Sequence, residues 1–318
     1  PFLTILARYE RLKSMGKYLL KRLGQSIIAI LGITVVVFFI LHLTGNPVEL
    51  MVSPTTSKEE MEILSEEMGF NDPLPVQYVR FLKGALVGDF GTSYYYTAMS
   101  VVLERAPATL TLACAALLIS VVLGIPAGIV AAVKRNSVSD AVIRVLALLG
   151  QCMPAFWLGI MLIMLFAVKL GWMPTGGAED GLRSLILPAF TLGVFSAATI
   201  CRLLRSNLIE VLGKEYIDVA KAKGLPKSKI IGKHALKNAM SSIITILGMQ
   251  FASLLGGSVI TEQVFAWPGV GRLVIQSITT SDFAVVECIV FLMAVIFVVI
   301  NFIVDVLYCV INPRVRLQ

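Results

Sequence analysis

Six long apolar stretches dominate this sequence of 318 residues. A helix needs roughly 20 predominantly apolar residues to cross the hydrocarbon core of a bilayer, and each stretch is of that order. Apolar residues make up 57% of the chain and charged residues 15%, which excludes a disordered chain and argues against a soluble enzyme. We therefore predict an all-α polytopic membrane protein. The predicted spans are residues 25–43, 108–133, 142–168, 184–204, 241–261 and 283–311.

The third stretch allows two interpretations. With its lead-in from Val138 it is longer than the bilayer is thick, and Pro154 lies in its middle. Proline kinks or ends a helix. The stretch is therefore either one kinked, tilted span or a tight hairpin of two short helices.

The distribution of charge decides between six and seven spans. With six spans and the N-terminus inside, 20 of the 27 basic residues lie on the inner side, and 14 of the 20 acidic residues lie outside. Splitting the third stretch would move nine basic residues of the loop 202–238 outside, against the positive-inside rule. We predict six spans with both termini cytoplasmic. The net charge of +7 then reflects membrane orientation, so we expect no nucleic-acid partner.

These spans define the predicted organisation of the chain. Met15 has the context of a natural start, so residues 1–14 are interpreted as a possible extension. Within the long external segment, Ser57 and Glu60 have the spacing of a capping box and predict a short acidic helix that ends near Met68. The parts are a cytoplasmic N-terminal segment 1–22, a first span 23–43, an external segment 44–105, a core 106–311 that includes a cytoplasmic loop 202–238, and a tail 312–318.

The chain lacks the residues that most transport or catalytic chemistry needs. The central parts of the spans carry no ionisable side chain, which argues against coupling to ions or protons. The three Gly-Lys pairs are followed by Tyr, Glu and His, so no P-loop is present. The five cysteines form no C-x-x-C pair, so neither a metal site nor a disulfide framework is predicted. The sequence also contains no recognisable catalytic set. If the chain moves solute uphill, the energy comes from a separate ATPase that meets a cytoplasmic surface.

The loop 202–238 is the candidate for that surface. Gly224 is expected to end its first helix, and Pro226 suits the first turn of a second helix that runs to Asn238. Ala220 and Gly224 lie four residues apart and predict a bare strip where the backbone of a partner can approach. The alternative is an amphipathic hairpin that lies on anionic lipid. Apolar residues with helical spacing in the first helix are Leu208, Val211, Leu212 and Val219.

Two parts of this loop resemble the EAA loop of ABC importer permeases. Residues 218–224 read Asp-Val-Ala-Lys-Ala-Lys-Gly, and residues 234–239 read His-Ala-Leu-Lys-Asn-Ala, similar to the H-x-L-[RK]-N-A pattern of the dipeptide/oligopeptide/nickel branch. Asp218 stands where the general motif has Glu, and Val219 where it has Ala. The resemblance implies the fold of a type I ABC importer permease and a loop that docks into an ATPase. The implied coupling residues are Asp218, Ala220, Ala222, Gly224, His234, Leu236 and Asn238.

A second motif resembles the same branch. Residues 262–272 read Glu-Gln-Val-Phe-Ala-Trp-Pro-Gly-Val-Gly-Arg, similar to the E-x-x-F-x-W-P-G-x-G signature just outside the fifth span. Pro268-Gly269 favours a turn, and we expect Phe265 and Trp267 to anchor it at the membrane interface. Residues 88–96, 104–110 and 312–314 also resemble the family. The residues predicted to form an external docking turn are Glu262, Phe265, Trp267, Pro268, Gly269 and Gly271.

The resemblance implies the B-type permease of an importer in a bacterial or archaeal plasma membrane. Its partners would be a homologous second permease, two ATPase subunits, an external solute-binding protein and the lipid bilayer. ATP and Mg would bind the ATPases, so this non-catalytic chain would hold no cofactor. The solute would be a di- or oligopeptide or a glutathione-like ligand; the alternative in the same family is nickel or a metal chelate. A stand-alone channel or secondary transporter is the alternative from a different class.

The solute path is predicted from polar residues inside the apolar stretches. Helix breaks and polar residues near the midplane often line transporter cavities. The alternative role of the same residues is hydrogen bonding and sulfur packing between helices. The candidates are Gln151, Cys152, Met153 and Pro154 in the third span and Gln250 and Ser253 in the fifth.

Overall fold

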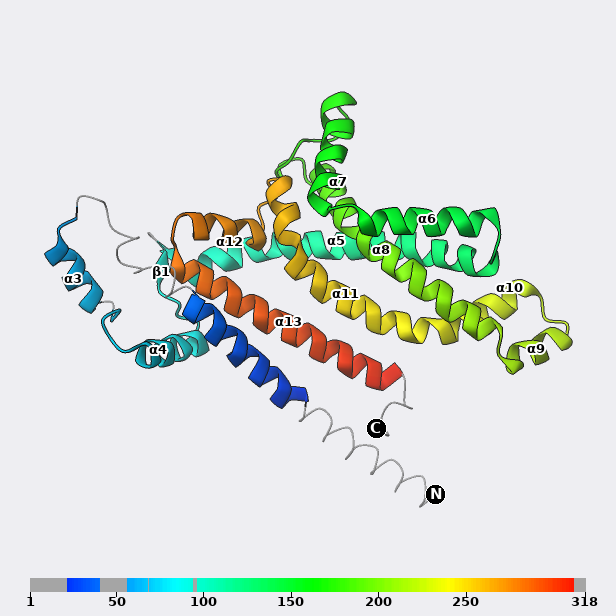
Figure 1. Ribbon diagram of the computed structural model, residues 1–318, viewed down its shortest axis with the longest axis horizontal. Coiled ribbons are helices and arrows are strands. Elements are labelled where there is room, and N and C mark those ends of the chain that lie inside the picture. Colours follow the sequence, from blue (N-terminus) through cyan, green and yellow to red (C-terminus); the bar gives the residue numbers. More distant parts are fainter. Residues whose placement is uncertain (1–21, 41–55, 68, 94–95, 312–318) are drawn as a thin grey trace, which may run out of the picture. The chain divides into compact units, whose positions relative to one another are not determined.

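A computed structural model describes residues 22–40, 56–67, 69–93 and 96–311, and Figure 1 shows its helices. The predicted extension 1–14 and the tail 312–318 lie outside these residues, as does Met68. Five helices are long and apolar enough to cross a membrane, and a bent helix pair raises the number to six if it counts as one span. This agrees with the predicted six spans. The chain divides into two compact units, which are described separately.

The described part of the first unit comprises residues 110–267 and 300–311. It contains most of the long α5 (Ala98–Val133), whose first residues belong to the second unit. The elements that follow in the first unit are α6 (Val138–Cys152), α7 (Ala155–Leu162), the π-helix η1 (Ile163–Lys169), α8 (Leu182–Leu212), α9 (Glu215–Ala222), α10 (Lys227–Lys229), the π-helix η2 (Ile230–Ala235) and α11 (Leu236–Val264).

The third apolar stretch is sharply broken. The axes of α6 and of the helix 155–169, formed by α7 and η1, differ by 104°. The residue before a proline avoids the α region for steric reasons, and Met153 is accordingly extended at φ −76°, ψ 131°. Pro154 then caps α7. The sequence left two interpretations open, a kinked span and a pair of short helices. The structure contains two helices joined at Pro154, and the angle between them is larger than a kink within one helix.

Glycines bring α5 and α8 into backbone contact. A Cβ atom on Gly124 would lie 2.7 Å from the carbonyl oxygen of Ala197, and one on Gly128 would lie 2.9 Å from that of Cys201. The two glycines have the G-x-x-x-G spacing that lets membrane helices approach closely. Bulkier residues at these positions would separate the two helices.

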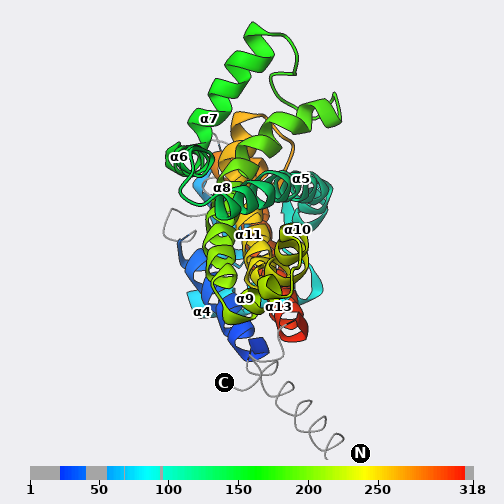
Figure 2. The same cartoon turned by 90° about the vertical axis from the view of Figure 1, so that its right-hand side faces the viewer.

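The core of the first unit lies where the ends of several helices meet. Leu204 and Leu208 of α8, Ile217 of α9, Ala235 of η2 and Ile243 of α11 are all completely buried there. α8 packs along α6 and along α11, as Figures 1 and 2 show from two sides. Apolar packing therefore holds the short helix α9 against the long helices α8 and α11.

The described part of the second unit comprises residues 22–109 with gaps and residues 268–299. It holds the apolar helix Arg22–Ile40, α3 (Lys58–Glu67), α4 (Leu74–Val87), the strands β1 (Thr92–Ser93) and β2 (Tyr96–Thr97), α12 (Val270–Thr279) and the first part of α13 (Phe283–Ile311). The strands pair antiparallel, with Ser93 opposite Tyr96. α4 is amphipathic and was not predicted.

Local signals and aromatic packing organise the second unit. The predicted capping box is confirmed: Glu60 N–H donates to Ser57 Oγ (3.2 Å), and Ser57 N–H donates to Glu60 Oε2 (3.1 Å). Phe90, just before β1, contacts Phe81 of α4 and Phe291 of α13, with ring centroids 6.1 and 5.4 Å apart. Phe90, within the family-like segment 88–96, thus contributes to a hydrophobic core.

Candidate functional site

The predicted loop 202–238 folds into a helix, a glycine turn and a second helical segment. α8 continues to Leu212, and Gly213 separates it from α9, so the predicted first helix is in fact two. After α9 the backbone turns at Gly224, whose φ is +72°. Gly224 N–H donates to Lys221 O (2.9 Å) and Leu225 N–H to Ala220 O (3.3 Å), the two bonds of a Schellman motif. The predicted helix end at Gly224 is confirmed.

The inner face of α9 is buried in the protein's own core. Ile217 is completely buried and Ala220 is 7% exposed, both packed among residues of α8, η2 and α11. The predicted bare strip was therefore wrong for Ala220, although a Cβ on Gly224 would meet open space. The outer face carries Tyr216 and Val219, which are 44% and 55% exposed.

The two halves of the EAA-like motif are joined by one side chain. Asn238 Nδ2 donates to Tyr216 Oη (3.0 Å) and to His234 O (2.9 Å), which connects α11 to α9. Leu236 packs against the core of the first unit. Asp218 and Ala222 are exposed, and Asp218 Oδ1 pairs with Lys221 Nζ at 2.8 Å.

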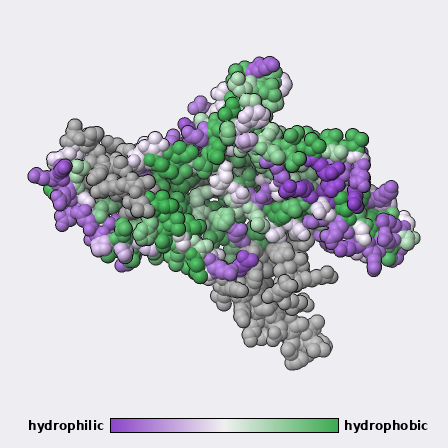
Figure 3. All heavy atoms as spheres, in the orientation of Figure 1, coloured by the Kyte–Doolittle hydropathy of each residue, from purple (hydrophilic) through white to green (hydrophobic). Residues whose placement is uncertain are grey.

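The surface of this region is strongly hydrophilic. Figure 3 shows hydrophilic residues gathered over α9 and α10 and hydrophobic ones over α6. Lys214 Nζ donates to Glu210 Oε1 (2.8 Å), and this hydrogen bond raises the pKa of Lys214. Both side chains are more than half exposed, so the pair contributes little to stability.

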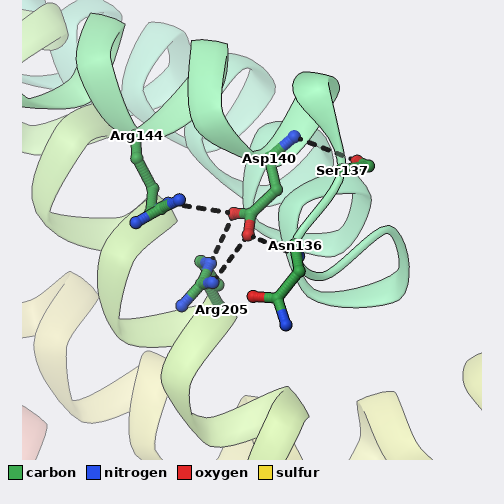
Figure 4. A network of polar contacts seen from close by, with 5 residues as sticks. All are labelled: Asn136, Ser137, Asp140, Arg144 and Arg205. Carbon is green, nitrogen blue, oxygen red and sulfur yellow. Dashed lines mark hydrogen bonds and ion pairs between the residues drawn. The ribbon is translucent and has the colours of Figure 1, made fainter.

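A buried ion pair clamps the start of α6 to α8, and the sequence prediction missed it. Arg205 donates from Nε (2.7 Å) and from a second guanidinium nitrogen (2.8 Å) to the two carboxylate oxygens of Asp140, which is 0% exposed (Figure 4). Asn136 N–H donates to the same carboxylate at 3.0 Å, and Arg144 lies 3.4 Å from it. Ser137 caps α6 by accepting from the Asp140 backbone N–H. That Ser-x-x-Asp cap was the one local signal, because Arg205 is 65 residues away.

Three of the predicted path residues line one cavity. Gln151, Gln250 and Ser253 border a cavity of about 420 Å³ in the first unit, between α6, α7, α8 and α11. Ser196 and Thr199 of α8 also line it and were missed. Gln151 Nε2 donates to Thr199 Oγ1 at 3.0 Å. The lining does not include the other candidates, Cys152, Met153 and Pro154.

The predicted docking turn is largely buried. Phe265 and Trp267 are 2% and 5% exposed, so the expectation that they anchor at the membrane interface was wrong. A Cβ on Gly176 would lie 2.5 Å from Phe265 O, which shows how closely the segment before α8 covers the turn. Glu262 is 0% exposed and accepts from Ser258 Oγ at 2.9 Å.

The remaining turn residues lie in the second unit and begin α12. Gly269 is its N-cap residue, and Gly271 is buried in its first turn. Val270 N–H donates to Thr109 Oγ1 (2.8 Å), which satisfies a donor that the helix leaves free. Pro268 is partly exposed.

The fold and these sites define a helical membrane protein with a polar loop fixed to its core, and comparison with known proteins gives its family. Residues 124–317 match the family described as "Binding-protein-dependent transport system inner membrane component", and residues 15–113 match the N-terminal family of such membrane components. The chain belongs to this family. It is a multi-pass inner-membrane permease subunit of an ABC importer, and such subunits are non-catalytic.

Relatives match the chain almost throughout. The oligopeptide transport system permease protein AppB of Bacillus subtilis (strain 168) is 38% identical over 315 residues, covering 95% of this chain and 100% of AppB. The glutathione transport system permease protein GsiC of Escherichia coli (strain K12) is 38% identical over 305 residues, covering 95% and 99%.

Solved structures share the fold. The MetNI methionine ABC transporter in inward-facing conformations aligns with a TM-score of 0.56 at 20% identity, covering 67% of this chain and 97% of that one. An amino acid ABC transporter aligns with a TM-score of 0.52 at 18% identity, covering 68% and 94%. The predicted permease fold is thereby confirmed.

Proposed function

We propose that this chain is the permease subunit of an ATP-driven importer for di- or oligopeptides. The observation that carries the proposal is the near full-length similarity to an oligopeptide permease and to a glutathione permease, since glutathione is itself a tripeptide. A second, homologous permease would complete the path. Two ATPase subunits would supply the energy, and an external solute-binding protein would deliver the peptide.

The charge distribution supports an orientation with both termini in the cytoplasm. The loop 202–238 then faces the cytoplasm with nine basic residues, as the positive-inside rule favours. α3, α4 and the β-hairpin belong to the external segment.

The loop is built to transmit force from an ATPase. The outer face of α9 presents Tyr216 and Val219, while its inner face is fixed to α8 and α11 by buried Ile217 and Ala220. Movement of α9 therefore carries the long helices with it. ATP binding closes the ATPases and draws the paired loops together; hydrolysis resets them. A loaded binding protein couples to this cycle by preferring one of the two states.

Most side chains of the external turn are buried, so the turn shapes the backbone beside a docking surface and contributes few side chains to that surface. The side chains of Glu262, Phe265 and Trp267 are buried, so they hold the turn in shape. Pro268 and the neighbouring external segment remain for contact with the binding protein.

The test is uptake by the complete importer in proteoliposomes. Trialanine should accumulate with ATP and the loaded binding protein, and an ion gradient without ATP should not replace them. Val219→Asp should lower uptake about tenfold or more, because it places a carboxylate in a docking contact. The matched control is Val138→Asp: Val138 is 80% exposed at the start of α6, where a helix tolerates an acidic residue.

Two results would contradict the proposal. Uptake driven by an ion gradient alone would place the chain among secondary transporters. Equal uptake by the Val219→Asp and Val138→Asp variants would remove α9 from the coupling mechanism.

A further inference from the structure

The cavity between α6, α7, α8 and α11 is lined by uncharged groups of two kinds. Gln151, Ser196, Thr199, Gln250 and Ser253 contribute amides and hydroxyls, and the rest of the lining is apolar: Ala155, Leu192, Phe195, Leu254 and Gly257. No charged residue is among them. Its volume of about 420 Å³ is within the range of small-molecule sites.

Much of the polar lining is available to a ligand. Gln151 and Thr199 bond to each other, and Thr199 also donates to Phe195 O at 3.3 Å. Within the described part of the chain, the side chains of Ser196, Gln250 and Ser253 make no hydrogen bond. Ser196 is only 4% exposed and borders the cavity, and its hydroxyl makes no hydrogen bond within the described residues. A hydroxyl at a cavity wall that has no protein partner is available to bond to water or to a solute.

The chemistry of this lining matches a peptide backbone. A glutamine carboxamide offers the same donor and acceptor as a peptide bond, and serine and threonine hydroxyls serve as either. Amides that leave water need replacement hydrogen bonds, and this lining supplies them. A wall without charge neither traps nor repels a peptide according to the charge of its side chains. Ser253 and Gly257 are exposed, so the cavity opens at the surface of this unit.

We propose that this cavity contacts the transported solute and recognises its amide groups, without selecting on net charge. The proposal rests on the peptide-importer function proposed above and assigns the contact to Gln250, Ser253 and Ser196. Gln151 and Thr199 are positioning residues that hold the wall formed by α6 and α8.

The experiment measures uptake by the complete importer in proteoliposomes with saturating loaded binding protein. Three probes are used: Ala-Ala-Ala, Ala-Lys-Ala and Ala-Glu-Ala. The wild type should transport them at maximal rates within about threefold of one another, less than the tenfold step of a strong selective contact. Gln250→Leu should slow all three by about two- to tenfold, the loss expected for one hydrogen bond. Gln276→Leu, the same change at an exposed residue of α12, should have no effect.

A charge variant and a small variant make the test independent of folding defects. Gln250→Glu should slow Ala-Glu-Ala relative to Ala-Lys-Ala, a charge-dependent difference that general misfolding would not produce. Ser253→Ala removes one exposed hydroxyl and should slow all three probes in the same direction as Gln250→Leu. ATPase activity of the Gln276→Leu complex without solute should equal that of the wild type.

Two results together would overturn the inference and leave the proposed function standing. The Gln250→Leu variant would transport all three peptides at wild-type rates, and the Gln250→Glu variant would keep the wild-type ratio of the Ala-Glu-Ala and Ala-Lys-Ala rates. A wild-type importer that transports none of the three peptides would overturn both.

Discussion

Replacing Asp140 by asparagine should loosen the first unit and leave the second unit unchanged. The carboxylate is 0% exposed and accepts two hydrogen bonds from Arg205, whose side chain is 22% exposed. An asparagine keeps the shape but removes the charge, so the Arg205 guanidinium stays largely buried without its counter-ion. Breaking a buried pair on one side costs about 3 kcal/mol, the lower end of the usual range because Arg205 reaches some solvent. This corresponds to about a hundredfold increase in the open population.

Two buried cysteines report on the two units separately. Cys201 is 4% exposed, one turn before Arg205 on α8, and Cys288 is 0% exposed in the second unit. Labelling of the purified protein with a maleimide, resolved for each cysteine by mass spectrometry, should be about a hundredfold faster at Cys201 in the Asp140→Asn variant. Labelling at Cys288 should not change.

The matched control is Asp72→Asn, which breaks the exposed ion pair between Asp72 and Arg80. Those side chains are 41% and 54% exposed, so the change should alter stability by about 1 kcal/mol or less. The double variant of Asp140→Asn with Arg205→Gln should be less destabilised than the sum of the two single variants. Wild-type labelling of Cys201 in Asp140→Asn, or equal acceleration at Cys288, would refute the clamp.

Three further substitutions have defined expectations. Gly124→Ala should lower the free energy of unfolding by about 1–3 kcal/mol, because the new Cβ meets the backbone of α8, whereas Gly32→Ala meets nothing within 4 Å and should be neutral in the same thermal denaturation. Ser57→Ala should destabilise α3 by about 1 kcal/mol, seen as faster amide hydrogen exchange confined to residues 58–67; unchanged exchange there would show that the capping box is unimportant. Gly224→Val should impose about 1–3 kcal/mol of backbone strain at φ +72° and lower uptake more than ATPase activity; normal uptake would contradict a coupling role for this turn.

The sequence predicted features that depend on neighbouring residues. The capping box of Ser57 and Glu60 formed as expected, since both of its bonds lie within one turn. The helix end at Gly224 followed from the preference of a left-handed position for glycine. Pro154 predicted a break, but the bend of 104° also depends on how α6 and α7 pack, which no local pattern contains.

The sequence could not predict which face of α9 is exposed, because α8 ends before α9 begins and the two helices do not share one periodic pattern. Leu208, Val211, Leu212 and Val219 share a face only if one helix continues through them. Gly213 interrupts it and resets the rotation, so Ile217 points inward and Val219 outward. The exposed face of α9 therefore differs from the expected strip.

Contacts between residues that are far apart in the sequence also could not be predicted. Asp140 and Arg205 were assigned to different loops, and only the packing of α6 on α8 brings them together. Ser196 and Thr199 escaped notice because serine and threonine in membrane helices commonly bond to their own backbone. The glutamines of the cavity were found because amides are rare within apolar spans.

Photo-crosslinking from α9 tests the central claim, that an ATPase drives this permease through that helix, most directly. A photoreactive amino acid at position 219 of the assembled importer should form a crosslink that mass spectrometry identifies as a P-loop ATPase subunit, with a yield that changes when ATP is added. The same amino acid at position 138 should give none. Crosslinks from position 219 to lipid alone, with or without ATP, would contradict the claim.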